Sequence, residues 1–272
     1  MTVWSNEGVK RAMQFKEVGN KEGKTIVFIH GAGISGWMWE KQLEYFKDYH
    51  CIVPDLPEHG LSINEGQLSI KNSAYSIVEI IKKYANGGKA HIVGHSIGAK
   101  IIVELLSTNP EIIDHAVIAS GLFRPIYYMK LTHKPYIYKL TTSMLKIKSL
   151  LKFTVKQFKF PDKASEDNLI LDFQRLTSDV LYRTYNELYE NLTLPQGLEK
   201  ANIPALVIAG EKEPKAMKES VADMIKVLPN GKGILIRKGL HTYPWAMYDI
   251  FNELIDQWIK NENIDNGSVI KL

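Results

Sequence analysis

The stretch AHIVGHSIG, residues 90–98, decides the fold of this chain. Its first half is a short apolar run, which is typical of a strand that is buried on both faces. An apolar helical pattern, IGAKIIVELLS at 97–107, follows directly, and Pro110 lies beyond it. The segment GHSIG at 94–98 is therefore a G-x-S-x-G pattern between a strand and a helix, the context that a nucleophile elbow requires.

Steric crowding at a sharp turn explains why this segment contains two glycines. A sharp strand-to-helix turn holds its central residue, Ser96, in a strained backbone conformation. The residues two positions away, Gly94 and Gly98, must then be small so that neighbouring chains can approach. The pattern predicts that Ser96 presents its hydroxyl at the carboxyl edge of the sheet, where open α/β folds bind ligands.

Outward from this segment, apolar runs alternate with helical patterns. The predicted strands are 25–31, 51–57, 90–96, 115–121, 205–210 and 233–239, and the clearest helices are 73–84, 97–107 and 250–260. Continuous apolarity indicates strands covered on both faces, as in parallel sheets. The alternation predicts an α/β fold with a doubly wound, mostly parallel sheet. The polar tail at 261–272 is expected to fray.

One long segment interrupts this alternation. Residues 122–203 contain no strand of the same kind and hold seven of the 13 tyrosines. We interpret the segment as a helical lid inserted into a core formed by residues 1–121 and 204–272. Its apolar and aromatic residues make a hydrophobic acyl pocket plausible, with tyrosine hydroxyls for a few polar contacts.

The lid also carries the excess positive charge of the chain. Residues 122–163 include ten basic side chains against a single acid, Asp162. If residues 144–159 are projected as one helix, an apolar face lies beside a stripe of lysines. The apolar face comprises Met144, Ile147, Leu151, Val155 and Phe158. Leu145 and Phe153 lie off this face. Such a helix can lie on an anionic surface or dock an acidic carrier protein. The simpler interpretation, which we favour, is that the apolar face closes over the pocket and the lysines are hydrated.

Two further motifs accompany the elbow in order along the chain. HGAG at 30–33 follows the first clear strand, and DLPEHGLS at 55–62 follows the next. With the elbow, they resemble the oxyanion loop and the D-L-P-x-H-G-x-S turn of the α/β-hydrolase fold family. The resemblance runs from about residue 25 to 260 with the lid excepted, and it implies that family's fold.

A serine hydroxyl needs a base to take its proton and a third group to orient that base. The family keeps its base after the last strand, where this chain has His241. The acid of relatives falls at the fourth position of G-x-x-D, which Glu213 occupies here, with Glu211 as a neighbouring rival. Some members place the acid after the earlier strand, but SGL at 120–122 has no carboxylate.

The resemblance also implies an oxyanion hole. The backbone N–H groups of Ile97 and Ala32 would stabilise a tetrahedral intermediate. Gly31 and Gly33 would let the loop bend inward, and His30 and His95 are interpreted as supporting residues of the two loops.

Several other classes of protein lack their signatures. No G-x-G-x-x-G or phosphate-loop pattern occurs, and the histidines do not have metal-ligand spacing, so we expect neither cofactor nor metal. Cys51 is the only cysteine, so no disulfide can form within the chain. The net charge of +4 is not accompanied by a nucleic-acid motif, so we do not expect a nucleic-acid partner. No apolar run is long enough to span a bilayer, and the first residues do not resemble a signal peptide, so we expect a cytoplasmic protein.

The sequence thus predicts a serine hydrolase that cleaves small acyl esters through an acyl-enzyme, with Ser96, His241 and Glu213 as catalytic residues. A thioesterase or carrier-protein esterase is the alternative within this fold, because of the basic lid. A binding protein with little turnover is the alternative of another class, invited by the glutamate at the position where relatives have aspartate.

Overall fold

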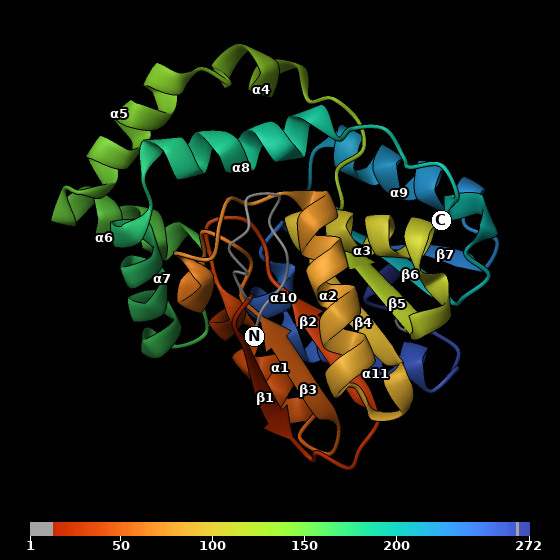
Figure 1. The fold of residues 1–272 in the computed structure, drawn as a ribbon. Coiled ribbons are helices and arrows are strands. Elements are labelled where there is room, and N and C mark those ends of the chain that lie inside the picture. Colours follow the sequence, from red (N-terminus) through yellow and green to blue (C-terminus); the bar gives the residue numbers. More distant parts are fainter. Residues whose placement is uncertain (1–12, 265–266) are drawn as a thin grey trace.

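The computed structural model describes residues 13–264 and 267–272 around one sheet (Figure 1). Its strands are β1 (Phe15–Gly19), β2 (Thr25–Ile29), β3 (His50–Pro54), β4 (Ala90–His95), β5 (Ile113–Ala119), β6 (Ala205–Gly210), β7 (Gly231–Ile236) and β8 (Val269–Lys271). Their order is β1-β3-β2-β4-β5-β6-β7-β8; β1 and β8 run antiparallel to their neighbours, and the other pairs are parallel. The predicted doubly wound, mostly parallel sheet is confirmed.

The six predicted strands are present, whereas the two edge strands were not predicted. The expectation that the tail frays is wrong for its last residues, because Val269–Lys271 pairs with β7. This pairing occupies backbone N–H and C=O groups that an open edge of β7 would leave unpaired. Val269 is also buried. A three-residue edge strand in a polar tail has too little periodicity to be read from sequence.

Helices cover both faces of the sheet. They are α1 (Glu40–Tyr45), α2 (Ile70–Tyr84), α3 (Ile97–Thr108), α9 (Lys215–Val227), α10 (Tyr243–Ala246) and α11 (Tyr248–Ile259). Because successive strand residues point to opposite faces, Val27 and Ile29 pack with α2, α3 and α9, while Ile26 and Phe28 pack with α11. Within residues 13–264 and 267–272, none of the helices combines the length and apolarity needed to cross a membrane.

The lid is helical, as predicted. Between β5 and β6 lie α4 (Tyr127–Thr132), α5 (Pro135–Leu145), α6 (Lys148–Gln157), α7 (Lys163–Arg175) and α8 (Ser178–Glu190). Figure 1 shows α4 and α5 farthest from the sheet, with α8 between them and the core. The exact boundaries at 122 and 203 stay a prediction.

The single apolar face predicted along residues 144–158 is not continuous. α5 ends at Leu145 and α6 begins at Lys148, so the short connection changes which side chains point inward. Leu145, Leu151 and Val155 are buried, whereas Met144 and Ile147 are about half exposed. Leu145, which the projection left unexplained, therefore belongs to the inner face of the lid.

Lys100 in α3 ties both ends of the lid to the core. Its side chain is buried, and Nζ donates to the carbonyl of Leu122, at 2.7 Å, and to the carbonyl of Asn191. Leu122 precedes α4 and Asn191 follows α8. Burial lowers the pKa of the Lys100 ammonium to about 7, and the carboxylate of Glu187 partly opposes this lowering.

We expect Lys100 to make stability depend on pH. Because folding lowers its pKa from 10.5 to about 7, the unfolded chain binds more protons between these values, and the free energy of unfolding should rise with pH across this window. Lys100→Met removes the titrating group and should show a smaller rise. Urea unfolding of both proteins at pH about 7 and about 9 measures the difference. An equal rise in both proteins would contradict the assignment, and the exposed Lys82→Met is the matched control.

Candidate active site

The turn between β4 and α3 has the strained geometry that the elbow pattern predicts. Ser96 has φ 56° and ψ −112°, a left-handed conformation that is costly for a residue with a side chain. Its N–H donates to the carbonyl of Ala119 at 2.8 Å, which holds the turn against β5. A Cβ at Gly94 would lie 2.6 Å from the carbonyl oxygen of Gly98, and one at Gly98 would collide with that of Ile29. These close approaches explain both glycines.

A carboxylate and an imidazole from two distant loops meet beside this turn. Nδ1 of His241 lies 2.6 Å from Oε1 of Glu213. Glu213 is buried, and its second oxygen accepts the N–H of Gly210, at 2.6 Å, and the hydroxyl of Ser120, at 2.8 Å. Hydrogen bonds to both oxygens satisfy a carboxylate that burial would otherwise destabilise.

The rival carboxylate is held elsewhere. Glu211 accepts the backbone N–H of Lys238 at 2.7 Å, and this hydrogen bond lowers the pKa of its carboxyl group. Among the described residues, His241 forms a hydrogen bond with the side chain of Glu213 and none with that of Glu211. Of the two candidates, the structure therefore brings Glu213 to the imidazole.

His95 connects the elbow to the loop of His241. Its Nε2–H donates to the carbonyl of His241 at 3.0 Å, and the centres of the two rings are 4.5 Å apart. Burial and the neighbouring His241 keep the pKa of His95 well below its usual value, so its ring is neutral. Among the described residues, no hydrogen bond joins the Ser96 hydroxyl to His241. Catalytic hydrogen bonds of this kind are often long in unliganded enzymes and tighten around substrate.

The loop at 30–33 lies against the elbow. A Cβ at Gly31 would be 3.0 Å from Nδ1 of His95, so a larger residue here would require the imidazole to shift. His30 fixes the loop, because its Nε2 accepts the N–H of Leu56, at 2.9 Å, while its Nδ1–H donates to the carbonyl of Gly31, at 2.7 Å. In the described part of the chain, the N–H groups of Ala32 and Ile97 have no hydrogen-bond acceptor.

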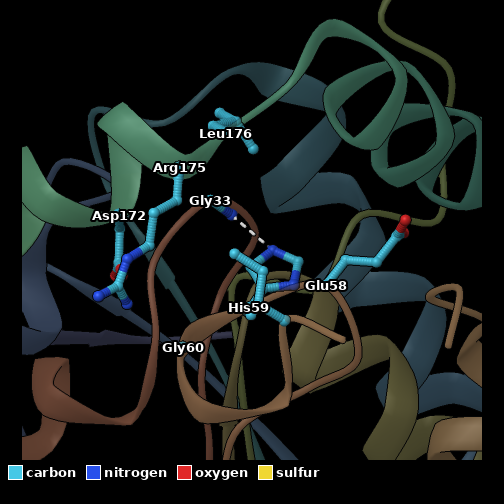
Figure 2. A pocket seen from close by; sticks show the side chains of 8 residues that line it. Gly33, Glu58, His59, Gly60, Asp172, Arg175 and Leu176 are labelled. Carbon is cyan, nitrogen blue, oxygen red and sulfur yellow. Dashed lines mark hydrogen bonds between the residues drawn. The ribbon is translucent and has the colours of Figure 1, made fainter. Parts of the chain in front are cut away.

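His59, from the predicted turn at 55–62, supports the same loop. Its Nε2 accepts the N–H of Gly33 at 3.0 Å, as Figure 2 shows, and its Nδ1–H donates to the carbonyl of Pro57. The hollow beside this contact is lined from the lid by residues of α7, among them Asp172. Asp172 accepts the Ser35 hydroxyl, at 2.9 Å, and the Trp37 indole N–H, at 2.7 Å, and so fastens the lid beside the loop.

A larger cavity lies between the lid and the oxyanion loop. Its volume is about 380 Å³, and Ala32 and Gly33 form its core end. The lid contributes mostly apolar and aromatic side chains, including Leu145, Phe173, Leu181, Tyr138, Tyr185 and Tyr189. Burial raises the pKa of Tyr138 to about 12, so its hydroxyl stays protonated, and this hydroxyl lies 2.7 Å from Nδ1 of His133.

Sequence reasoning missed two residues that support the acid. Ser120 donates to Glu213, and the buried hydroxyl of Tyr243 lies 3.2 Å from the Ser120 hydroxyl. Ser120 follows β5, at the position where some members of the family have the acid. The serine at this position could have indicated a supporting role, because its hydroxyl can donate to a carboxylate that follows β6.

Comparisons with known proteins agree with this architecture. The family described as alpha/beta hydrolase fold matches residues 24–140. A protein of Acinetobacter baylyi named (E)-2-((N-methylformamido)methylene)succinate hydrolase is 25% identical over 243 residues, which cover 88% of this chain and 91% of that protein.

Two solved structures share the fold. A serine hydrolase from Cycloclasticus zankles superposes with a TM-score of 0.73 at 19% identity, covering 92% of this chain and 95% of that one. A thermophilic esterase from Thermogutta terrifontis has a TM-score of 0.69 at 16% identity, covering 96% and 97%. The family match spans the loop at 30–33 and the elbow, and the solved structures extend the likeness in fold to most of the chain. The chain thus has the α/β-hydrolase fold, and its residues 24–140 match the family of that name.

Proposed function

We propose that this protein is a serine hydrolase that cleaves carboxylic esters through an acyl-enzyme intermediate. The hydrogen bond between His241 Nδ1 and Glu213, on a ring beside the Ser96 elbow, carries the proposal. A carboxylate that accepts Nδ1–H leaves the lone pair on Nε2, which can take a proton from a serine hydroxyl. The names of the Acinetobacter and Thermogutta proteins, a hydrolase and an esterase, support the same reaction class.

In the proposed reaction, Ser96 Oγ attacks the ester carbonyl while His241 Nε2 takes its proton. The carbonyl oxygen becomes an oxyanion, which accepts hydrogen bonds from the N–H groups of Ala32 and Ile97. Glu213 stabilises the imidazolium, which then protonates the leaving alkoxide as the C–O bond breaks. His241 then deprotonates a water molecule, which attacks the acyl group on Ser96. The imidazolium returns this proton to Oγ of Ser96 as the acyl–oxygen bond breaks, which releases the carboxylic acid and restores the serine hydroxyl.

The cavity under the lid is evidence that the enzyme binds a hydrophobic acyl group of its substrate. It begins at the oxyanion loop, at Ala32 and Gly33, and extends among apolar and aromatic lid residues. A volume of about 380 Å³ falls within the range of small-molecule sites. We therefore propose that the acyl chain enters this cavity and that the alcohol leaves on the other side of Ser96.

Labelling with a fluorophosphonate tests this function directly, because the reagent reacts with activated serines. Intact-mass analysis should find one adduct per chain in the wild type and none in Ser96→Ala, and peptide mapping should locate it on Ser96. Labelling should also be slowed by a hydrophobic acyl ester added as competitor. If the folded wild type remains unlabelled, the proposal fails and a binding protein with little turnover becomes the better description.

A further inference from the structure

The outer surface of the lid exposes apolar side chains in an ordered pattern. Tyr136, Leu140 and Met144 recur every four residues on α5 and are 68%, 58% and 45% exposed. Residues four apart lie on the same face of a helix, so they form one stripe. Tyr127 and Leu131 repeat this spacing on α4, and they are 80% and 64% exposed. Soluble monomers seldom expose a contiguous apolar surface of this kind without a binding role.

The same helix is apolar on its inner face. Ile137, Tyr138, Thr141 and Leu145 line the cavity under the lid, whereas the stripe at 136, 140 and 144 faces away from it. Closing over the pocket therefore accounts for only one face of α5. Figure 1 shows that α4 and α5 form the layer of the lid farthest from the sheet, so the described core does not cover the outer stripe.

The charged residues of the segment that carries this stripe have one sign. The sequence from 122 to 161 contains no aspartate or glutamate, and its basic residues are Arg124, Lys130, Lys134, Lys139, Lys146, Lys148, Lys152, Lys156 and Lys159. Lys134, Lys139, Lys146 and Lys148 are exposed next to the stripe or just beyond the end of α5. If the lysines were only hydrated, neither the exposed apolar stripe nor the absence of acidic residues from 122–161 would be explained. An anionic surface complements this charge, and a lipid surface also accepts the apolar side chains.

We propose that the outer face of the lid, formed by α4, α5 and the start of α6, docks on anionic lipid bilayers. In this orientation the stripe inserts at the boundary of headgroups and acyl chains, and the lysines contact lipid phosphates. Residues of α5 line the cavity, so docking brings the cavity close to a source of hydrophobic esters. Docking itself does not depend on the proposed chemistry at Ser96.

Co-sedimentation with vesicles tests the proposal without measuring turnover. The wild type should bind vesicles of phosphatidylglycerol and phosphatidylcholine in equal parts, and bind vesicles of phosphatidylcholine alone far more weakly. The triple variant Lys139→Gln/Lys146→Gln/Lys148→Gln should reduce partition into anionic vesicles by about 10²-fold, because each lysine contributes separately to binding. The triple variant Tyr136→Ser/Leu140→Ser/Met144→Ser should lose binding to a similar extent.

Three exposed lysines in α2 and just after it provide a control for the lysine variant. Lys71→Gln/Lys82→Gln/Lys89→Gln removes the same charge from exposed positions away from the lid, and it should bind as the wild type does. Circular dichroism checks that the lid variants fold, which their exposed positions favour. Equal binding by the lid and control variants would overturn the proposal. So would loss of binding in the lysine variant alone, because the apolar stripe would then not enter the lipid.

Discussion

Ser96→Ala should lower kcat for a short p-nitrophenyl ester by about 10⁶-fold, because without the nucleophile only the oxyanion hole and substrate binding remain. The loss should appear in kcat and leave KM nearly unchanged, since the hydroxyl acts in the chemical step. Alanine has a Cβ as serine does, so the strained turn between β4 and α3 should persist. Steady-state kinetics, with circular dichroism of both proteins, measure this effect.

Ser120→Ala is the matched control. Ser120 also follows a parallel strand, at the end of β5, and has the same φ of 56°. Its hydroxyl is occupied by Glu213 and adjoins Tyr243. Its removal deletes one hydrogen bond to the acid and should cost about tenfold or less. If Ser120→Ala and Ser96→Ala lowered kcat equally, the nucleophile would be misassigned.

Glu213→Gln should lower kcat by about 10⁴-fold, the loss seen when a triad carboxylate becomes an amide. Glutamine keeps the length of the side chain and can still accept from Gly210 and Ser120. Its NH₂ group, however, favours the imidazole tautomer with the proton on Nε2, which cannot accept the proton of Ser96. The amide also removes the charge that stabilises the imidazolium.

Glu211→Gln controls for the loss of a nearby carboxylate. The Glu211 carboxylate accepts the N–H of Lys238 and, among the described residues, forms no hydrogen bond with His241, so this change should leave kcat within about threefold of the wild type. The pair of variants also decides between the two acids that the motif allows. A larger effect at 211 than at 213 would reverse the assignment.

The elbow and the sheet could be predicted because their causes are local. An apolar strand, glycines two residues before and two residues after Ser96, and an apolar helix are adjacent in sequence. Strands buried on both faces are continuous apolar runs. The edge strands β1 and β8 were missed because they are short and partly exposed. The break at 146–147 was missed because both sides of it continue a helical pattern.

The order of the motifs, the parallel sheet and the helical character of the insertion could be read from the sequence, since they follow from patterns within short windows. The carboxylate that reaches His241 could not be read in this way, because Glu211 and Glu213 are two residues apart and differ only in what surrounds them in the folded chain. The support from Ser120 and the anchoring of the lid by Lys100 were likewise decided by packing. These contacts join segments up to about a hundred residues apart. They form only when the folded sheet places the carboxyl ends of its parallel strands at one edge.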